Sequence, residues 1–338
     1  MDNQKDNYSV TLVVTPRERF SCAQTSLESI YQHTKTPFKL IYVDGNSPQK
    51  ICRYLQQQAR EKNFYHLRKN YYLSPNHARN LGLELVETKY VVFIDNDVIV
   101  SPGWLSQLID CAEATSAMVV GPLMCQNEPI HEIVHFAGGE SHIFCDAKGR
   151  RRLREKMYLQ GKRVADIRNR LQRQETELAE FHCVLVNTAI FKQIGNLDEA
   201  MLNTKEHLDF CMQVAAAGGK IYFEPNCIVT YVPGPPLDVT DIPYYMLRWS
   251  DAWVLDSLKR LREKWNLTED AYFTSKYKGL GWRRRDSIIQ PLSRALTLGR
   301  KSYRLENLLT RLDKKLNRYL SDRYYEEVVK SREVKNEL

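Results

Sequence analysis

Short apolar runs alternate with amphipathic segments along the first hundred residues. Tyr8–Thr15, Phe38–Val43 and Phe64–Arg68 have the composition of β-strands, and Val91–Ile94 is apolar throughout. The segments between these runs are predicted to be helices: one ends at about His33, one runs from Pro48 to about Asn63, and one runs from Ser74-Pro75 to about Glu87. Strands that alternate with helices in this way indicate βαβ units and a mainly parallel sheet flanked by helices. The predicted fold class is therefore α/β.

The pattern is less regular in the second half of the chain. It predicts helices over 104–114, 189–194 and 205–217, strands over 118–120, 183–186, 220–223 and 228–231, and a polar helical stretch near 162–178. After the break at Pro233-Gly-Pro-Pro236, apolar residues recur only at helical spacing. We therefore expect one α/β domain over residues 1–238, with an insertion at about 141–180, and a helical extension over 239–338.

Basic residues are concentrated in the insertion and the extension. The chain of 338 residues has a net charge of +8. Residues 241–338 contain 22 Lys and Arg against 14 Asp and Glu, and residues 141–180 contain 11 against 6. The remaining residues are mildly acidic. The insertion is expected to border the acceptor of whatever reaction the α/β domain performs.

The sequence also bears on where the protein is found. No apolar run approaches the ~18 residues of a membrane span, and the first residues lack the apolar core of a signal peptide. The eight cysteines are scattered without a C-x-x-C pair, as reduced buried thiols would be. We expect a cytoplasmic protein, with peripheral attachment to the inner face of a membrane left open.

Two carboxylates, Asp95 and Asp97, follow the most apolar strand of the chain. Open α/β sheets hold their ligands outside the carboxyl ends of their strands. Carboxylates placed there suit a divalent cation that carries a diphosphate, because Mg²⁺ is commonly held by one or two carboxylates and substrate phosphates. The alternative is an acidic turn, since Asp and Asn are frequent in turns.

Other predicted strands also end in polar side chains. Thr15, Arg17 and Glu18 follow the first strand, and Asp44 and Asn46 follow the second. An acid at the second position can accept hydrogen bonds from a ribose or a base, and an Arg can offset diphosphate charge. The chain has neither a G-x-x-x-x-G-K-[ST] nor a G-x-G-x-x-G motif, which argues against P-loop and nicotinamide-dinucleotide proteins.

At this point the chain resembles the inverting glycosyltransferases of family 2, which have the nucleotide-diphospho-sugar transferase (GT-A) fold. The resemblance is carried by Val43-Asp-Gly-Asn-Ser47, Ala78-Arg-Asn-Leu-Gly82, Ile94-Asp-Asn-Asp97, Phe191-Lys-Gln-Ile-Gly-Asn-Leu-Asp-Glu199 and Glu206-His-Leu-Asp-Phe-Cys211. The order and spacing of these motifs match over roughly residues 8–235.

The resemblance implies roles for these residues. Asp44 would contact the base or ribose, Arg79 would lie near the nucleotide, and Asp95 and Asp97 would form the D-x-D site for metal and sugar diphosphate. The residues expected to bind the donor are Thr15, Arg17, Glu18, Asp44, Asn46, Arg79, Asp95 and Asn96, and those expected to bind metal are Asp95 and Asp97.

The general base departs from the family pattern. In the family this base is the acid that ends a Glu-Asp pair at the start of a helix, and His207 occupies that position here. An imidazole titrates near neutrality and can act as a base. Alternatively, Glu206 or Asp209 is the base and His207 binds the acceptor, or His207 only packs in the helix. The three residues are therefore predicted as a catalytic group, without a ranking.

A second departure concerns the metal. Many GT-A enzymes place a metal-binding His after the last strand, where this chain has Tyr231. The expected cofactor is a divalent cation, Mg²⁺ or Mn²⁺, and the sequence leaves open whether the reaction strictly requires it.

The extension carries Trp249, Trp253, Trp265 and Trp282, the last beside Arg283-Arg-Arg285. A basic, aromatic helical segment of this kind is suited to an anionic lipid surface that holds a lipid-linked acceptor. The alternative is a solvated helical cap on the α/β domain. Nucleic-acid binding is not expected, because acids dilute the basic residues and no known module is visible.

The leading hypothesis is an enzyme that transfers a sugar from a nucleotide-diphospho-sugar (UDP-, GDP- or dTDP-linked) to a hydroxyl acceptor, with inversion by single displacement. The acceptor is a glycan, a lipid-linked molecule or a small molecule. Alternatives are a nucleotide-sugar-binding protein without transferase activity and a peripheral membrane scaffold. A sugar-1-phosphate nucleotidyltransferase is disfavoured because Thr15-Pro-Arg-Glu18 is not a Gly-rich loop.

Overall fold

The computed structural model describes residues 9–232 and 237–329, so Tyr8 and the predicted break at 233–236 lie outside the described residues. The chain divides into two compact units. The first, which we call the sheet unit, comprises Met1–Glu199 and Glu206–Pro233. The second, the helical unit, comprises Ala200–Lys205 and Gly234–Leu338. Each unit is described by itself below.

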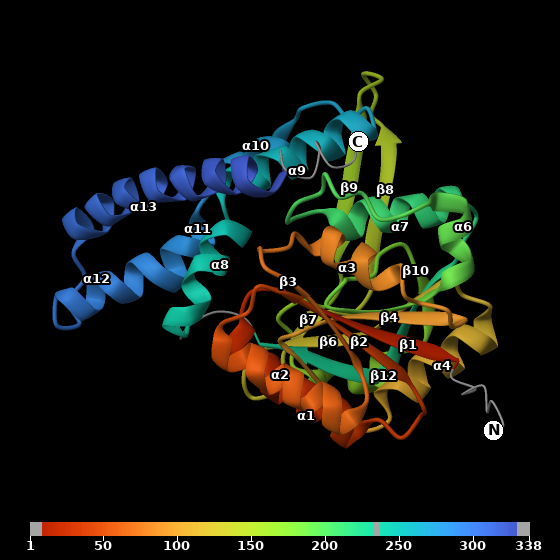
Figure 1. The fold of residues 1–338 in the computed structure, drawn as a ribbon. Coiled ribbons are helices and arrows are strands. Elements are labelled where there is room, and N and C mark those ends of the chain that lie inside the picture. The colour runs from red at the N-terminus through yellow and green to blue at the C-terminus, as the bar shows by residue number, and fades with distance from the viewer. Residues whose placement is uncertain (1–8, 233–236, 330–338) are drawn as a thin grey trace, which may run out of the picture. The chain divides into compact units, whose positions relative to one another are not determined.

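A sheet of ten strands forms the centre of the sheet unit (Figure 1). Its main path runs β10 (Gln174–Thr176), β12 (Ile221–Tyr231), β6 (Val119–Gln126), β11 (Cys183–Asn187), β4 (Tyr90–Asp95), β1 (Val10–Thr15), β2 (Lys39–Gly45) and β3 (Tyr65–Lys69), with β5 (Val98–Val100) on β12 and β7 (Val134–Phe136) on β6. Strands β1 to β4 are mutually parallel where they pair, as are β6 and β12, whereas β11 is antiparallel to both of its neighbours. The predicted α/β class with a mainly parallel sheet is confirmed.

Helices cover both faces of this sheet. The helices α1 (Ala23–His33), α2 (Gln49–Lys62) and α4 (Trp104–Thr115) lie on one face, and α3 (Pro75–Leu83) and α7 (Glu206–Ala216) lie on the other (Figure 1). Shorter helical turns are η1 (Phe20–Cys22), η3 (Thr188–Ile190) and α6 (Phe191–Ile194). The strands β1 and β4 are buried at every position, which explains their continuous apolar runs.

A glycine sets how closely α3 approaches the sheet. A Cβ atom added to Gly82 would lie 2.3 Å from Cγ1 of Val13 in β1, so the Val13 side chain or the helix would have to shift to admit it. The Ala78–Gly82 motif therefore ends in glycine because the helix rests directly on the strand. This close packing fixes the position of Arg79, one turn earlier in the helix.

The insertion differs from its prediction. The polar helix expected near 162–178 is wrong: the segment contains one helical turn, α5 (Val164–Ile167), the 3₁₀ turn η2 (Arg168–Arg170) and strand β10. Val164 and Ile167 pack into an apolar cluster with Leu123 and Phe223, so tertiary packing overrides the local helical pattern. The residues before it form a hairpin of β8 (Gly139–Cys145) and β9 (Arg151–Met157) that the sequence did not reveal.

Other boundaries also shift. The two strands predicted over 220–223 and 228–231 are one strand, β12, with a register shift between Glu224 and Ile228. The helix expected to run from Ser74 to about Glu87 ends at Leu83.

The helical unit contains only helices and connecting segments among its described residues, as predicted. These are η4 (Val239–Asp241), α8 (Ile242–Arg248), α9 (Asp251–Lys264), α10 (Ala271–Lys278), α11 (Trp282–Arg284), η5 (Arg285–Ile289), α12 (Gln290–Leu296), α13 (Tyr303–Tyr324) and η6 (Tyr325–Val329). The segment 200–205 belongs to this unit because Ser257 in α9 accepts hydrogen bonds from the backbone N–H groups of Leu202 and Asn203.

Side chains singled out for a lipid surface behave differently in the structure. Trp253 and Arg284 are buried in the helical unit, and Trp282 is the exposed member of the four tryptophans. Within the described residues, no helix combines the length and apolar character needed to cross a membrane.

Candidate donor and metal site

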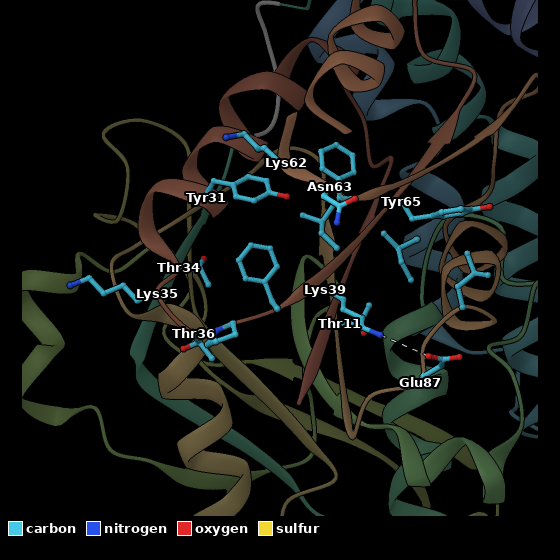
Figure 2. A pocket seen from close by; sticks show the side chains of 16 residues that line it. Thr11, Tyr31, Thr34, Lys35, Thr36, Lys39, Lys62, Asn63, Tyr65 and Glu87 are labelled. Carbon is cyan, nitrogen blue, oxygen red and sulfur yellow. Dashed lines mark ion pairs between the residues drawn. The ribbon is translucent and has the colours of Figure 1, made fainter. Parts of the chain in front are cut away.

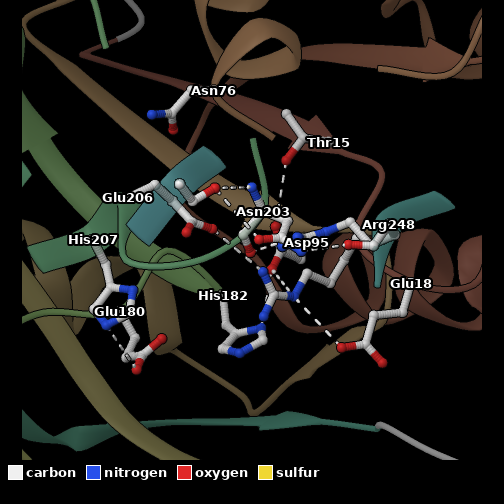
Figure 3. Close-up of polar contacts among 12 residues, drawn as sticks. Thr15, Glu18, Asn76, Asp95, Glu180, His182, Asn203, Glu206, His207 and Arg248 are labelled. Atoms are coloured by element: carbon white, nitrogen blue, oxygen red, sulfur yellow. Dashed lines mark hydrogen bonds and ion pairs between the residues drawn. The ribbon is translucent and has the colours of Figure 1, made fainter. Parts of the chain in front are cut away.

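The ends of β1 and β4 meet because the two strands are parallel and in register, with Thr15 opposite Asp95. The Thr15 hydroxyl lies 3.4 Å from Asp95 Oδ1 and donates to it (Figure 3). The side chain of Asn96 accepts from the backbone N–H of Arg17 and donates to the carbonyl of Arg19. The two strand ends therefore form one rigid edge, as the sequence predicted for Thr15, Arg17 and Asp95.

Nitrogen-bearing side chains surround Asp95. Its carboxylate lies 3.0 Å from Nδ1 of His182, 3.4 Å from Nη2 of Arg79 and 3.7 Å from Nε of Arg17. Burial alone would raise the pKa of Asp95, but the hydrogen bond from His182 and the charges of Arg79 and Arg17 lower it to about 2. Asp95 is thus held as a carboxylate.

Arg79 is completely buried rather than facing a solvent-filled cleft. Its guanidinium donates to Asn76 Oδ1 at 3.2 Å, stacks 4.1 Å above the ring of Phe181 and lies 3.9 Å from Glu206 Oε1. Together with the contact to Asp95, these partners make Arg79 a brace between α3, β4 and α7.

Asp97 contrasts with Asp95. Its side chain is 1% exposed, and neither carboxylate oxygen has a hydrogen-bond partner among the described residues. Burial, and then the negative charges of Asp95 and Glu18, raise the pKa of Asp97 well above its usual value. A buried acid without a donor is stabilised as a carboxylate by a cation. The ligand atoms of Asp95, Asp97 and His182 lie within 4.8 Å of one another, so this group can hold a metal ion.

His182 was missed by the sequence reasoning. It directly precedes β11, and its carbonyl accepts from the backbone N–H of Asp95 because β11 runs antiparallel to β4. Its ring stacks on Tyr231 with 4.0 Å between centroids, and His135 packs edge-on against both rings. The only hint of His182 in the sequence was its position just before an apolar strand. The sequence does not show that β11 runs antiparallel to β4, which is what brings His182 to Asp95.

The three base candidates at the start of α7 have different neighbours. Glu206 Oε1 lies 3.5 Å from Nη1 of Arg17, and His207 Nε2 lies 3.6 Å from Glu180 Oε1. Asp209 accepts a hydrogen bond from Gln213, one turn along the same helix. The structure therefore brings Glu206 into the Asp95 cluster and pairs His207 with Glu180.

Glu180 was also missed. Burial raises the pKa of a carboxyl, but the imidazoles of His207, His182 and His135 lower that of Glu180 below its usual value. His135, Glu180 and His182 form a second group whose ligand atoms lie within 4.8 Å of one another. Carboxylates and imidazoles from three separated segments thus adjoin the Asp95 site.

Asp44 at the end of β2 has its own set of donors. It accepts hydrogen bonds from the backbone N–H and hydroxyl of Ser47, from Arg68 and from His66. Burial raises its pKa, but these partners together lower it. Burial, followed by the charge of Asp44 and also that of Asp97, raises the pKa of Tyr42, so both carboxylates lie near this ring.

Glu18 and Asn46 complete the predicted donor set. Glu18 is fully buried, 3.8 Å from Nε of Arg17. Asn46 has a φ of 65°, a left-handed conformation that Asn tolerates better than most residues, and it turns the chain after β2. Its place at the strand end agrees with the prediction, whereas its role there stays a prediction.

A separate hollow of about 690 Å³ lies at the other end of the strands (Figure 2). It is lined by Thr11 of β1, Lys39 of β2 and Tyr65 of β3, near the first residues of these strands, and by Tyr31 and Lys62 from α1 and α2. Since Asp95 and Asp97 are at the carboxyl ends, this hollow is not part of their site.

Comparisons with known proteins agree with this geometry. The chain is similar to the pre-mycofactocin glycosyltransferase of two Mycobacterium tuberculosis strains, with 25% identity over 158 residues. That match covers 46% of this chain and 30% of the length of those relatives. The structure also resembles that of GalNAc-T7 with UDP, GalNAc and Mn²⁺, with a TM-score of 0.52 and 15% identity, over 82% of this chain and 56% of the other. This second likeness shows that the fold is of the GT-A type.

The model of the family described as "Glycosyl transferase family 2" matches residues 11–195, more than half of the chain. This range contains both strand ends of the Asp95 site, Arg79, Asp97 and His182. The chain therefore belongs to glycosyltransferase family 2.

Proposed function

We propose that the protein transfers a sugar from a nucleotide-diphospho-sugar to a hydroxyl acceptor, with inversion at the anomeric carbon. The observation that carries this proposal is Asp97, a buried acid without a hydrogen-bond donor, beside the fixed carboxylate of Asp95. That pair stands at the carboxyl ends of parallel strands, where open α/β sheets bind ligands. We assign catalysis to residues 1–238 and regard residues 239–338 as a helical extension.

A divalent cation fits this site. Asp97 and Asp95 would hold it through oxygen, and His182 would supply a nitrogen ligand. The stacking of His182 on Tyr231 supports this role, because Tyr231 occupies the position where the sequence lacked the expected metal-binding His. Imidazole ligands suit transition metals better than Mg²⁺, which favours Mn²⁺. When bound, the cation neutralises charge on the departing diphosphate.

The residues of the chain have separate tasks in the proposed reaction. Arg17 lies beside the Asp95 cluster and would offset donor phosphate charge, while Arg79 braces Asp95 from the interior. Asp44, whose carboxylate accepts from Ser47 and Arg68, orders the turn after β2 and would lie near the nucleoside.

His207 is the base that the geometry favours. Its imidazole is paired with Glu180, and a carboxylate partner orients an imidazole and stabilises it once it has taken a proton. Glu206 instead faces the guanidinium groups of Arg17 and Arg79, an arrangement suited to positioning. His207 would accept the proton of the acceptor hydroxyl as that oxygen attacks the anomeric carbon and the nucleoside diphosphate departs.

The donor class is proposed to be a UDP-sugar, which the UDP in the GalNAc-T7 structure supports. A thermal-shift screen of UDP-, GDP- and dTDP-sugars, with and without Mn²⁺, tests this choice. We expect the largest shift with a UDP-sugar and Mn²⁺ together, followed by slow release of UDP. Tight UDP binding without any turnover on acceptor panels would instead favour a binding protein.

A further inference from the structure

The long helix α13 has an unusual distribution of side chains. The residues it buries are polar, namely Glu306, Asn317 and Ser321. Its leucines at 308, 312 and 316 are more than half exposed, as is Tyr319. A helix on the surface of a globular protein normally buries its apolar face and exposes its polar face. In α13 these three polar residues are therefore turned inward, while four large apolar side chains are left outside.

Specific contacts hold the buried polar residues of α13 in place. Asn317 donates to the carbonyl of Met246 in α8 and accepts from the backbone N–H of Asp251 in α9. Asp313 lies 3.0 Å from the buried guanidinium of Arg284. These paired groups fix the rotation of α13 about its axis, so the outward position of the leucines is set by the fold.

The outward leucines of α13 lie on one side of the helix, and two more exposed leucines precede the helix in the chain. Residues 308, 312 and 316 are four apart and Tyr319 follows three later, which places them on one side of the helix. Leu296 at the end of α12 and Leu298 in the following turn are 62% and 94% exposed. We call these six residues, Leu296, Leu298, Leu308, Leu312, Leu316 and Tyr319, the apolar strip.

The charge around this strip has one sign. Residues 292–319 contain eight Lys and Arg, all exposed, and two acids, Glu306 and Asp313. Both acids are turned inward and paired, Glu306 with Arg285 and Asp313 with Arg284. The exposed charges that accompany the apolar strip are therefore cationic.

We propose that the apolar strip and its basic neighbours dock on an anionic phospholipid surface. Apolar side chains would enter the boundary between headgroups and acyl chains, while Lys and Arg contact lipid phosphates. A second copy of the chain fits less well, because two such surfaces would bring like charges together. This surface replaces the tryptophans suggested by the sequence, since Trp253 is buried.

Vesicle co-sedimentation of the full chain tests the proposal without donor, metal or turnover. We expect binding to vesicles of equal parts phosphatidylglycerol and phosphatidylcholine, weakening as salt is added, and little binding to phosphatidylcholine alone. Leu312→Ser with Leu316→Ser should lower the partition coefficient at least tenfold. Lys314→Gln with Lys315→Gln should lower it several-fold and reduce its salt dependence.

Matched controls separate this surface from general effects. Leu85→Ser removes a similarly exposed leucine from the sheet unit, and Lys259→Gln removes an exposed charge from α9. Both should bind vesicles like the unchanged protein, and all variants should keep its melting temperature. Absence of binding to anionic vesicles at low salt would overturn the proposal. So would a concentration-dependent dimer that the leucine variants abolish, because the strip would then belong to a second copy.

Discussion

Each unit buries an arginine completely, yet the surroundings of the two arginines differ. In the helical unit, Arg284 contacts Asp313 and Asp251 at 3.0 Å and donates to the carbonyl of Trp249. In the sheet unit, Arg79 lies 3.4 Å from Asp95 and 3.9 Å from Glu206. The first cluster is closed by short contacts. The second keeps a nearby carboxylate, Asp97, for which the described residues supply no donor.

This difference distinguishes structural from functional burial of charge. A buried ion pair with satisfied partners holds helices in register, and its removal leaves charges uncompensated. A buried acid that lacks a partner costs stability and persists where a ligand completes it. We therefore infer that the Arg284 cluster serves the fold, and we propose that the Asp97 cluster serves the reaction.

The largest expected effect comes from Asp97→Asn. Turnover should fall by about 10³-fold or more, because the cation would lose a carboxylate where diphosphate charge develops. The melting temperature without metal should stay the same or rise, because a buried charge is removed. UDP release and differential scanning calorimetry measure the two quantities. A variant with unchanged kcat would remove Asp97 from the metal site.

Replacing Arg284 by Met should have the opposite effects: a large loss of stability rather than a loss of turnover. Its loss leaves Asp313 and Asp251 without their cation, at a cost of about 3–5 kcal/mol in the free energy of unfolding. The adjacent Arg285→Met is a matched control, since Arg285 is exposed and its pair with Glu306 should contribute about 1 kcal/mol or less. Denaturant titration measures both. Equal effects of the two variants would contradict a structural role specific to Arg284.

The pairing of His207 with Glu180 predicts a smaller loss. His207→Asn should lower kcat by about 10²-fold, the usual contribution of a general base. Glu180→Gln should lower it less and displace a limb of the pH–rate profile. Glu177→Gln breaks a similar but exposed pair with His142 of β8 and should change neither quantity. A Glu180 variant with the same profile as the Glu177 variant would refute the pairing.

The pH dependence of stability distinguishes the two aspartates. The raised pKa of Asp97 means that its contribution to stability is present below the unfolded value of about 3.9 and is lost as pH rises through the folded value. The lowered pKa of Asp95 has the reverse effect, with stability lost only as pH falls toward about 2.

Melting temperatures in chelator should therefore fall less with rising pH in Asp97→Asn than in the unchanged protein. Adding Mn²⁺ should recover the melting temperature that is lost at high pH in the unchanged protein, but not in Asp97→Asn. If the melting temperature changed with pH by the same amount in both proteins, Asp97 would not titrate over the pH range measured.

The sequence revealed the order of strands and helices through residue 115, apart from the short strand β5, and the placement of Asp95 beside Thr15 and Arg17. Apolar runs and the polar residues that follow them are local features of the sequence, and in this part of the chain they predicted the strands and their ends correctly. His182 was missed because it reaches Asp95 through an antiparallel strand, and Glu180 and His135 were missed because tertiary packing brings them beside His182. The outward position of Leu308, Leu312 and Leu316 was likewise hidden, since leucine spacing does not tell which side of a helix turns inward.

Binding of Mn²⁺ to the chain tests the central claim most directly. Electron paramagnetic resonance titration in the presence of UDP should give one bound Mn²⁺ per chain in the unchanged protein. In Asp97→Asn the affinity should fall by about 10²-fold, and His182→Ala should weaken it by about 10-fold or more. Equal Mn²⁺ affinity in the unchanged protein and in Asp97→Asn would contradict the account.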